Sequence, residues 1–75
     1  MNDDFSFEIV KNFGALSTAK TGWIYELNLV SWGGKTPKYD LRSWSPDHQK
    51  MGKGSTFTDD ELKALRDLLN SLDLN

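Results

Sequence analysis

Basic and aromatic side chains are interleaved in the middle of this sequence. Two tryptophans, Trp32 and Trp44, stand there among basic residues. Flat rings can stack on unpaired bases and cations attract phosphates, so the mixture is suited to binding a single nucleic-acid strand. Each ring could instead belong to a core, and each cation to ordinary solvated surface. The basic candidates for nucleic-acid binding are Lys38, Arg42, Lys50 and Lys53.

The charge is distributed unevenly along the chain. The 75 residues have a net charge of −2 at pH 7. Residues 31–57 hold five basic and two acidic residues, a net charge of +3, whereas the segments on either side are acidic. Because local charge governs attraction at a binding surface, the acidic total does not exclude nucleic acid as a partner.

Few residues in the sequence could catalyse a reaction or hold a metal. There is no cysteine and one histidine, His48, so neither a thiolate metal site nor a histidine cluster is expected. Acidic residues 59–61 are typical of a helix N-terminus, and Asp47 beside His48 is typical of a turn. Gly33-Gly34 lacks the Lys-Ser/Thr of a phosphate-binding loop. We therefore predict a binding protein with no cofactor, metal or small-molecule substrate, and no enzyme.

The length predicts a single domain over residues 1–75, because two cores would each be too small to persist. Aromatic residues make up 12% of the chain, which indicates a folded protein rather than a disordered one. Without disulfides, packing must supply the stability, and a second chain could share it. We find no signal peptide and no apolar segment long enough to span a membrane, and we expect a cytoplasmic protein, which could associate with the nucleoid.

Four segments show the two-residue alternation of β-strands. The first runs over residues 5–16 and is expected to bend at Gly14, and the others cover residues 23–32, 38–45 and 51–57. Segments rich in Gly, Pro and small polar residues separate them, as turns require.

The alternation gives the second and third strands two different faces. We expect the face with Leu27, Leu29 and Leu41 to form the core, and the opposite face to be exposed. Asp40 lies on that opposite face, where it could orient Arg42, pair with a lysine of a neighbouring strand, or accept a hydrogen bond from a base. The nucleic-acid-binding candidates on the opposite face are Asn28, Trp32, Arg42 and Trp44.

Residues 58–72 change to a helical period. Thr58 and Glu61 have the spacing of a capping box, and acidic residues fill the first turn. The helix could bury its leucines against the concave side of a sheet, against another chain, or against both. Five leucines exceed what one small sheet needs for cover, which predicts a homodimer. The leucine stripe consists of Leu62, Leu65, Leu68, Leu69 and Leu72.

Two motifs resemble the transcriptional positive cofactor four (coactivator p15) family. They are Tyr-Asp-Leu-Arg-Ser-Trp at residues 39–44, and Lys-Gly at residues 53–54 ahead of a Thr-capped acidic helix. Residues 43–48 and 51–54 are similar to the small bacterial YdbC-type single-stranded DNA-binding members. The resemblance covers about residues 5–72. The chain departs from the family pattern at Leu41, where Ile is usual, and at Ser55, where Ile often follows Lys-Gly.

The resemblance implies an α+β fold in which a strongly curved four-stranded antiparallel sheet is followed by one C-terminal helix. It also implies a homodimer that binds single-stranded DNA across its sheets, with a role in transcription regulation or in DNA replication and repair. RNA is left open as a second ligand. The long basic and serine-rich tail of the eukaryotic coactivators is missing, so contacts with activators are not implied. The alternative function is a protein-interaction module that docks through the leucine stripe.

Overall fold

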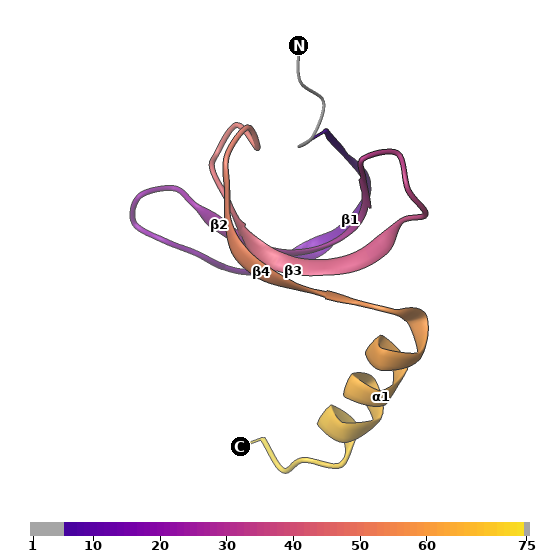
Figure 1. Ribbon diagram of the computed structural model, residues 1–75. Coiled ribbons are helices and arrows are strands. Elements are labelled where there is room, and N and C mark those ends of the chain that lie inside the picture. The colour runs from indigo at the N-terminus through magenta and orange to yellow at the C-terminus, as the bar shows by residue number, and fades with distance from the viewer. Residues whose placement is uncertain (1–5, 75) are drawn as a thin grey trace.

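The computed structural model describes residues 6–74, which form four strands and one helix (Figure 1). Phe5 of the predicted first strand lies outside the described residues. The order of elements confirms the predicted α+β fold. The elements are β1 Phe7–Thr18, β2 Ile24–Trp32, β3 Lys38–Trp44, β4 Met51–Phe57 and α1 Asp59–Asn70.

The strands form one antiparallel sheet in the order β1-β2-β3-β4, so each strand pairs with its neighbour along the chain. The sheet is strongly curved, and α1 lies beyond its outer side (Figure 1). We call the inner side, which carries Asp40, Arg42 and Trp44, the concave face. The outer side, which carries Leu27 and Leu41, is the convex face.

The edge strand β1 contributes to this curvature through three register shifts against β2. They fall between Ile9 and Lys11, between Asn12 and Gly14, and between Ala15 and Ser17. Gly14 has φ 142°, a backbone conformation that side chains rarely allow. Bulges bend a strand and increase its twist, and they also discourage pairing with a second edge. The predicted bend at Gly14 is confirmed as one of three.

The most deeply buried side chains belong to the concave face. Val30 and Trp44 are both 0% exposed, and so are the polar Asn28 and Asp40. The prediction that the leucine face is the core is therefore wrong for a single chain. Curvature explains the difference, because it brings the side chains of the concave face together and spreads those of the convex face apart.

The helix begins as predicted and lies on the convex side of the sheet. Thr58 accepts a hydrogen bond from the backbone N–H of Glu61, and the Glu61 carboxylate accepts one from the backbone N–H of Thr58. Leu62 and Leu65 border an apolar groove together with Leu41, so burial against the concave side is wrong. No residue of α1 is buried, and Leu68 is 64% exposed. Within residues 6–74 no helix has the length and apolar character needed to cross a membrane.

Candidate nucleic-acid interface

The concave face carries a continuous row of rings. Phe7 stands between the two tryptophans, with its ring centroid 6.0 Å from that of Trp32 and 5.3 Å from that of Trp44. The His48 ring stacks on Trp44, with 5.8 Å between the two ring centroids. The row arises because Phe7 pairs with Trp32 in the β1–β2 register, and because the turn after β3 folds His48 back over the sheet. Tilted contacts at these separations are favourable for aromatic pairs.

Arg42 lies over one face of the Trp32 ring. Its guanidinium carbon is 4.7 Å from the ring centroid, a cation–π distance. The guanidinium is held by Asp40, because Nε and Nη2 each donate a hydrogen bond of 2.7 Å to the Asp40 carboxylate. Asp40 is fully buried and the Arg42 side chain is 14% exposed. Of the three roles considered for Asp40, the structure therefore supports the orientation of Arg42.

Gly54 on β4 makes this position of Arg42 feasible. A Cβ atom at Gly54 would stand 2.5 Å from the Leu41 carbonyl oxygen and 2.9 Å from Nε of Arg42. Both separations are shorter than real Cβ contacts. The glycine of the Lys-Gly motif thus lets β4 approach the part of β3 that carries Arg42, while Lys53 beside it stays exposed.

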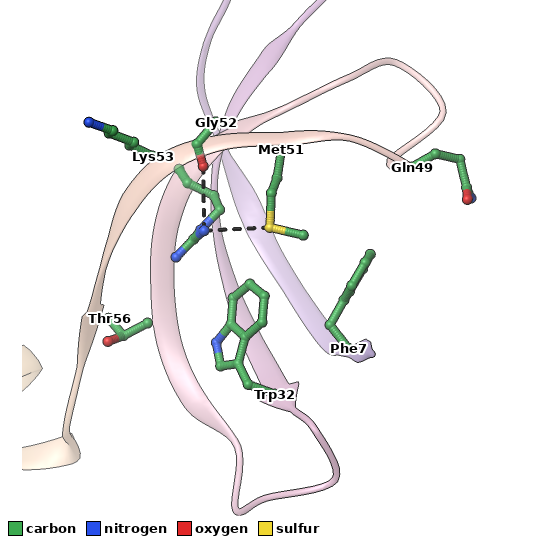
Figure 2. Close-up of a pocket in the computed structure, with 8 residues that line it drawn as sticks. Phe7, Trp32, Gln49, Met51, Gly52, Lys53 and Thr56 are labelled. Atoms are coloured by element: carbon green, nitrogen blue, oxygen red, sulfur yellow. Dashed lines mark hydrogen bonds between the residues drawn. The ribbon is translucent and has the colours of Figure 1, made fainter. Parts of the chain in front are cut away.

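These groups border a groove of about 910 Å³ on the concave face (Figure 2). The Trp32 ring lies in its centre, and the Lys53 side chain extends away from that ring at the rim (Figure 2). The groove is open and mostly apolar, and carries polar groups on β4 and on the turn before it. Its lining consists of Phe7, Trp32, Arg42, Gln49, Met51, Gly52, Lys53 and Thr56.

A polar cluster occupies the concave face beyond the ring row. Glu26 accepts hydrogen bonds from Nδ2 of Asn28 at 3.0 Å and of Asn12 at 3.3 Å. Nδ2 of Asn12 also donates to Oδ1 of Asn28 at 2.7 Å. Nε2 of His48 lies 3.0 Å from the Glu26 carboxylate and ties the β3–β4 turn to β2. This cluster satisfies a buried carboxylate that would otherwise be costly.

The β3–β4 turn is ordered by its own polar groups. The Asp47 carboxylate accepts hydrogen bonds from the backbone N–H of Gln49 at 3.0 Å and from the Ser45 hydroxyl at 2.8 Å. These bonds lower the pKa of Asp47, with the Gln49 bond contributing most. His48 has φ 60°, a left-handed conformation that is uncommon outside glycine. The turn places His48 against the Trp44 ring and the Glu26 carboxylate.

The structure brings three of the predicted site residues together in the groove, namely Trp32, Arg42 and Lys53. Lys38 and Lys50 are exposed but do not line it. Asn28 is fully buried, and its amide is engaged by Asn12 and Glu26, so any contribution to binding must pass through those neighbours.

Trp44 does not have the exposure that strand alternation predicted. It is 0% exposed, and the rings of Phe7 and His48 pack against it. Trp32 is half-buried between Phe7 and Arg42. The indole N–H groups of both tryptophans are buried without a hydrogen-bond partner among the residues described.

Phe7 and Met51 line the groove, although the sequence pattern does not single them out as binding residues. The alternation assigns Phe7 to a strand only, and its place beside Trp32 depends on the β1–β2 register. Sδ of Met51 lies 3.5 Å from Nη1 of Arg42 (Figure 2). No local sequence signal fixes either contact, although the alternation of Phe7 with Ile9 does indicate that both share one face.

Two comparisons with known proteins give matches to this chain. The family model of Transcriptional Coactivator p15 (PC4) matches residues 19–68, a region that covers β2, β3, β4 and most of α1. An uncharacterized protein of Treponema pallidum (strain Nichols) is 56% identical over 75 residues, which is 100% of this chain and 88% of that protein.

Proposed function

The chain belongs to the Transcriptional Coactivator p15 (PC4) family, and from this membership we propose that it binds single-stranded DNA on its concave face with little sequence specificity. The groove that joins Trp32 and Arg42 with Lys53 is the observation that carries the proposal. Rings and a guanidinium plane can stack on any unpaired base, and an exposed lysine can contact phosphate whatever the sequence.

The same chemistry favours a single strand over a duplex. Bases inside a duplex are stacked on each other and are closed to aromatic side chains on a sheet. Unpaired RNA offers the same rings and phosphates as unpaired DNA, so we include it as a second ligand. We propose that the protein acts in the cytoplasm, where it could associate with the nucleoid. Its role would lie in transcription regulation or in DNA replication and repair, as a binding protein rather than an enzyme.

The convex face supports a homodimer. Leucines of the sheet and of α1 border an open apolar groove of about 480 Å³. Leu69, which lines it, is 46% exposed in the single chain. A second copy of the chain would bury this surface. We expect sedimentation at micromolar concentration to give a species of twice 8.5 kDa, and Leu69→Glu to shift it toward the monomer, with Leu74→Glu as the control outside the groove.

A titration with matched oligonucleotides tests the main proposal. Single-stranded DNA, single-stranded RNA and duplex DNA of one length are added in turn while the intrinsic tryptophan fluorescence is recorded. We expect the single strands to change the emission, salt to reverse the change, and the duplex to bind more weakly. Equal affinity for duplex and single strand would exclude the stacking mode.

The same titration decides about the alternative function. A module that docks proteins through the leucine stripe is favoured by one observation, the exposure of Leu68 and Leu69. Such a module would leave the emission unchanged with every oligonucleotide. A response to single strands together with a dimer on sedimentation would assign the stripe to self-association.

A further inference from the structure

We propose that Arg42 contributes to single-strand binding as a planar stacking surface whose charge is cancelled by Asp40, rather than as a phosphate-binding cation. Asp40 is then a positioning residue for the groove. This inference rests on the proposed function, and it divides the basic residues of the site into two kinds that the sequence does not distinguish.

The N–H groups of the Arg42 guanidinium are engaged by acceptors within the protein. A guanidinium has five N–H groups that lie in one plane. In Arg42, Nε and Nη2 donate to Asp40 at 2.7 Å, and Nη1 donates to the Gly52 carbonyl oxygen at 3.4 Å and to Sδ of Met51 at 3.5 Å. Figure 2 shows the two Nη1 contacts as dashed lines. Protein groups thus occupy nearly the whole edge that a phosphate would need.

The charge of Arg42 is neutralised by the carboxylate of Asp40. Its carboxylate partner is fully buried and meets it with two short bonds. An ion pair of this geometry stays intact when a ligand binds, because separation would leave an uncompensated charge in the interior. The Asp40–Arg42 pair therefore adds no net charge to the groove. Lys53 differs, since it is exposed and forms no ion pair with another residue in the described range 6–74.

The remaining surface of Arg42 is the face of its plane. One side lies over Trp32 at 4.7 Å, and the side chain borders the groove. Arginine planes stack on rings as well as pairing with anions, which a lysine cannot do. Gly54 and Asp40 fix this plane from two strands, so it is preorganised for a base that enters the groove.

Salt dependence separates a stacking plane from a cation. For a single strand, each phosphate contact adds about 0.7 to the slope of log K against log salt. We measure this slope with a fluorescein-labelled single-stranded DNA oligonucleotide for the wild type, Asp40→Asn/Arg42→Gln and Lys53→Gln. The double variant removes both members of the pair at once, so no buried charge is left alone.

We expect the double variant to bind about tenfold more weakly with an unchanged slope, because it loses the stacking plane and no net charge. Lys53→Gln, the matched control in the same groove, should reduce the slope by about 0.7. A double variant that flattens the slope as Lys53→Gln does would overturn the inference. So would full affinity in the double variant.

Two single variants give independent readouts. Arg42→Lys keeps a cation and loses the plane, so we expect it to bind no better than the double variant, and recovery of wild-type affinity would contradict the inference. Asp40→Asn frees the guanidinium charge, so its slope should become steeper by about 0.7. A flatter slope than that of the wild type would contradict it. If the wild type fails to bind any single strand, the proposed function fails as well. If the wild type binds and the double variant has a flatter salt slope, only this inference is overturned.

Discussion

The two faces of the sheet differ in burial, and the difference is the reverse of what their polarity suggests. The concave face contains charged and polar groups, yet it holds Trp44, Asn28 and Asp40 with no exposed surface. The convex face is rich in leucine, yet its helix has no buried residue. Burial in this chain therefore follows the curvature of the sheet rather than the hydropathy of each face. The polar face is buried within one chain, whereas the apolar face leaves Leu68 and Leu69 exposed.

This difference predicts that the loss of a large side chain from the concave face destabilises the fold. Trp44→Ala removes a fully buried ring from the concave face and should lower the free energy of unfolding by about 3 to 5 kcal/mol. The measurement is urea unfolding followed by circular dichroism at one fixed protein concentration, because a dimer makes stability depend on concentration.

The control for Trp44→Ala lies outside the sheet, beyond the end of α1. Leu74→Ala, at an exposed position outside the convex groove, should change stability by less than about 0.5 kcal/mol. A Trp44→Ala variant as stable as this control would place the ring at the surface, in agreement with the exposure that strand alternation predicts.

The next largest effect on stability is expected where β4 approaches β3 closely, at Gly54. Gly54→Ala forces a methyl group against the Leu41 carbonyl oxygen and Nε of Arg42, which overpacks the concave face. We expect a decrease of about 1 to 3 kcal/mol in the free energy of unfolding, together with weaker single-strand binding. Gly34→Ala is not a neutral control, because Gly34 has φ 76°.

A suitable control is Gly52→Ala on the same strand, since its Cβ would meet only ordinary contacts, the nearest at 3.8 Å from Cβ of Ser43. Equal effects of the two substitutions would show that the destabilisation arises from strand propensity and not from contact with Arg42.

The contrast between local and distant signals explains which predictions succeeded. The helix start at Thr58 and the strand periods depend on neighbouring residues, and both were predicted. The identity of the buried face depends on the curvature of the sheet, to which the bulges of β1 contribute, and alternation alone cannot tell an inner from an outer face. The contact between Asp40 and Arg42 was among the roles considered for Asp40, because the two residues share a face of one strand. The position of Phe7 beside Trp32 depends instead on a strand pairing across 25 residues.

Removal of the half-buried ring should act on binding more than on folding. Trp32→Ala removes the ring beneath Arg42, and we expect it to cost about 1 to 3 kcal/mol in the binding of single-stranded DNA with a nearly unchanged salt slope. The measurement is a titration at several salt concentrations, with a thermal melt of the same sample. Full affinity in Trp32→Ala would exclude this ring from the interface, and an unfolded variant would assign it to the core.

Single exposed lysines should have smaller effects. Replacing Lys38, Lys50 or Lys53 with Ala should leave the fold intact and flatten the salt slope by about 0.7 for each phosphate that the variant no longer binds. Lys53 lines the groove, and the other two do not. Lys63→Ala on α1 is the matched control, because this lysine lies next to Asp59 on the opposite side of the sheet. A slope changed equally by Lys63→Ala would mean that overall charge, rather than the concave face, attracts the strand.

The smallest expected effect concerns the β3–β4 turn, which carries the His48 ring that stacks on Trp44. The bonds from the Gln49 N–H and the Ser45 hydroxyl stabilise ionised Asp47 and lower its pKa. A pKa that is lower in the folded than in the unfolded chain stabilises the fold above the unfolded value, and this stabilisation is lost as the pH falls through the folded value. NMR titration of the Asp47 carboxyl should therefore give a midpoint below the usual aspartate range.

Ser45→Ala should move that midpoint partway back, because the larger Gln49 contribution remains. Binding of single strands near pH 7 should not change in this variant, since Asp47 is ionised in both proteins there. An ordinary midpoint in the wild type would show that the turn is not held by Asp47. The order of the concave face would then depend at this end on the contact between His48 and Glu26, which joins the turn directly to β2.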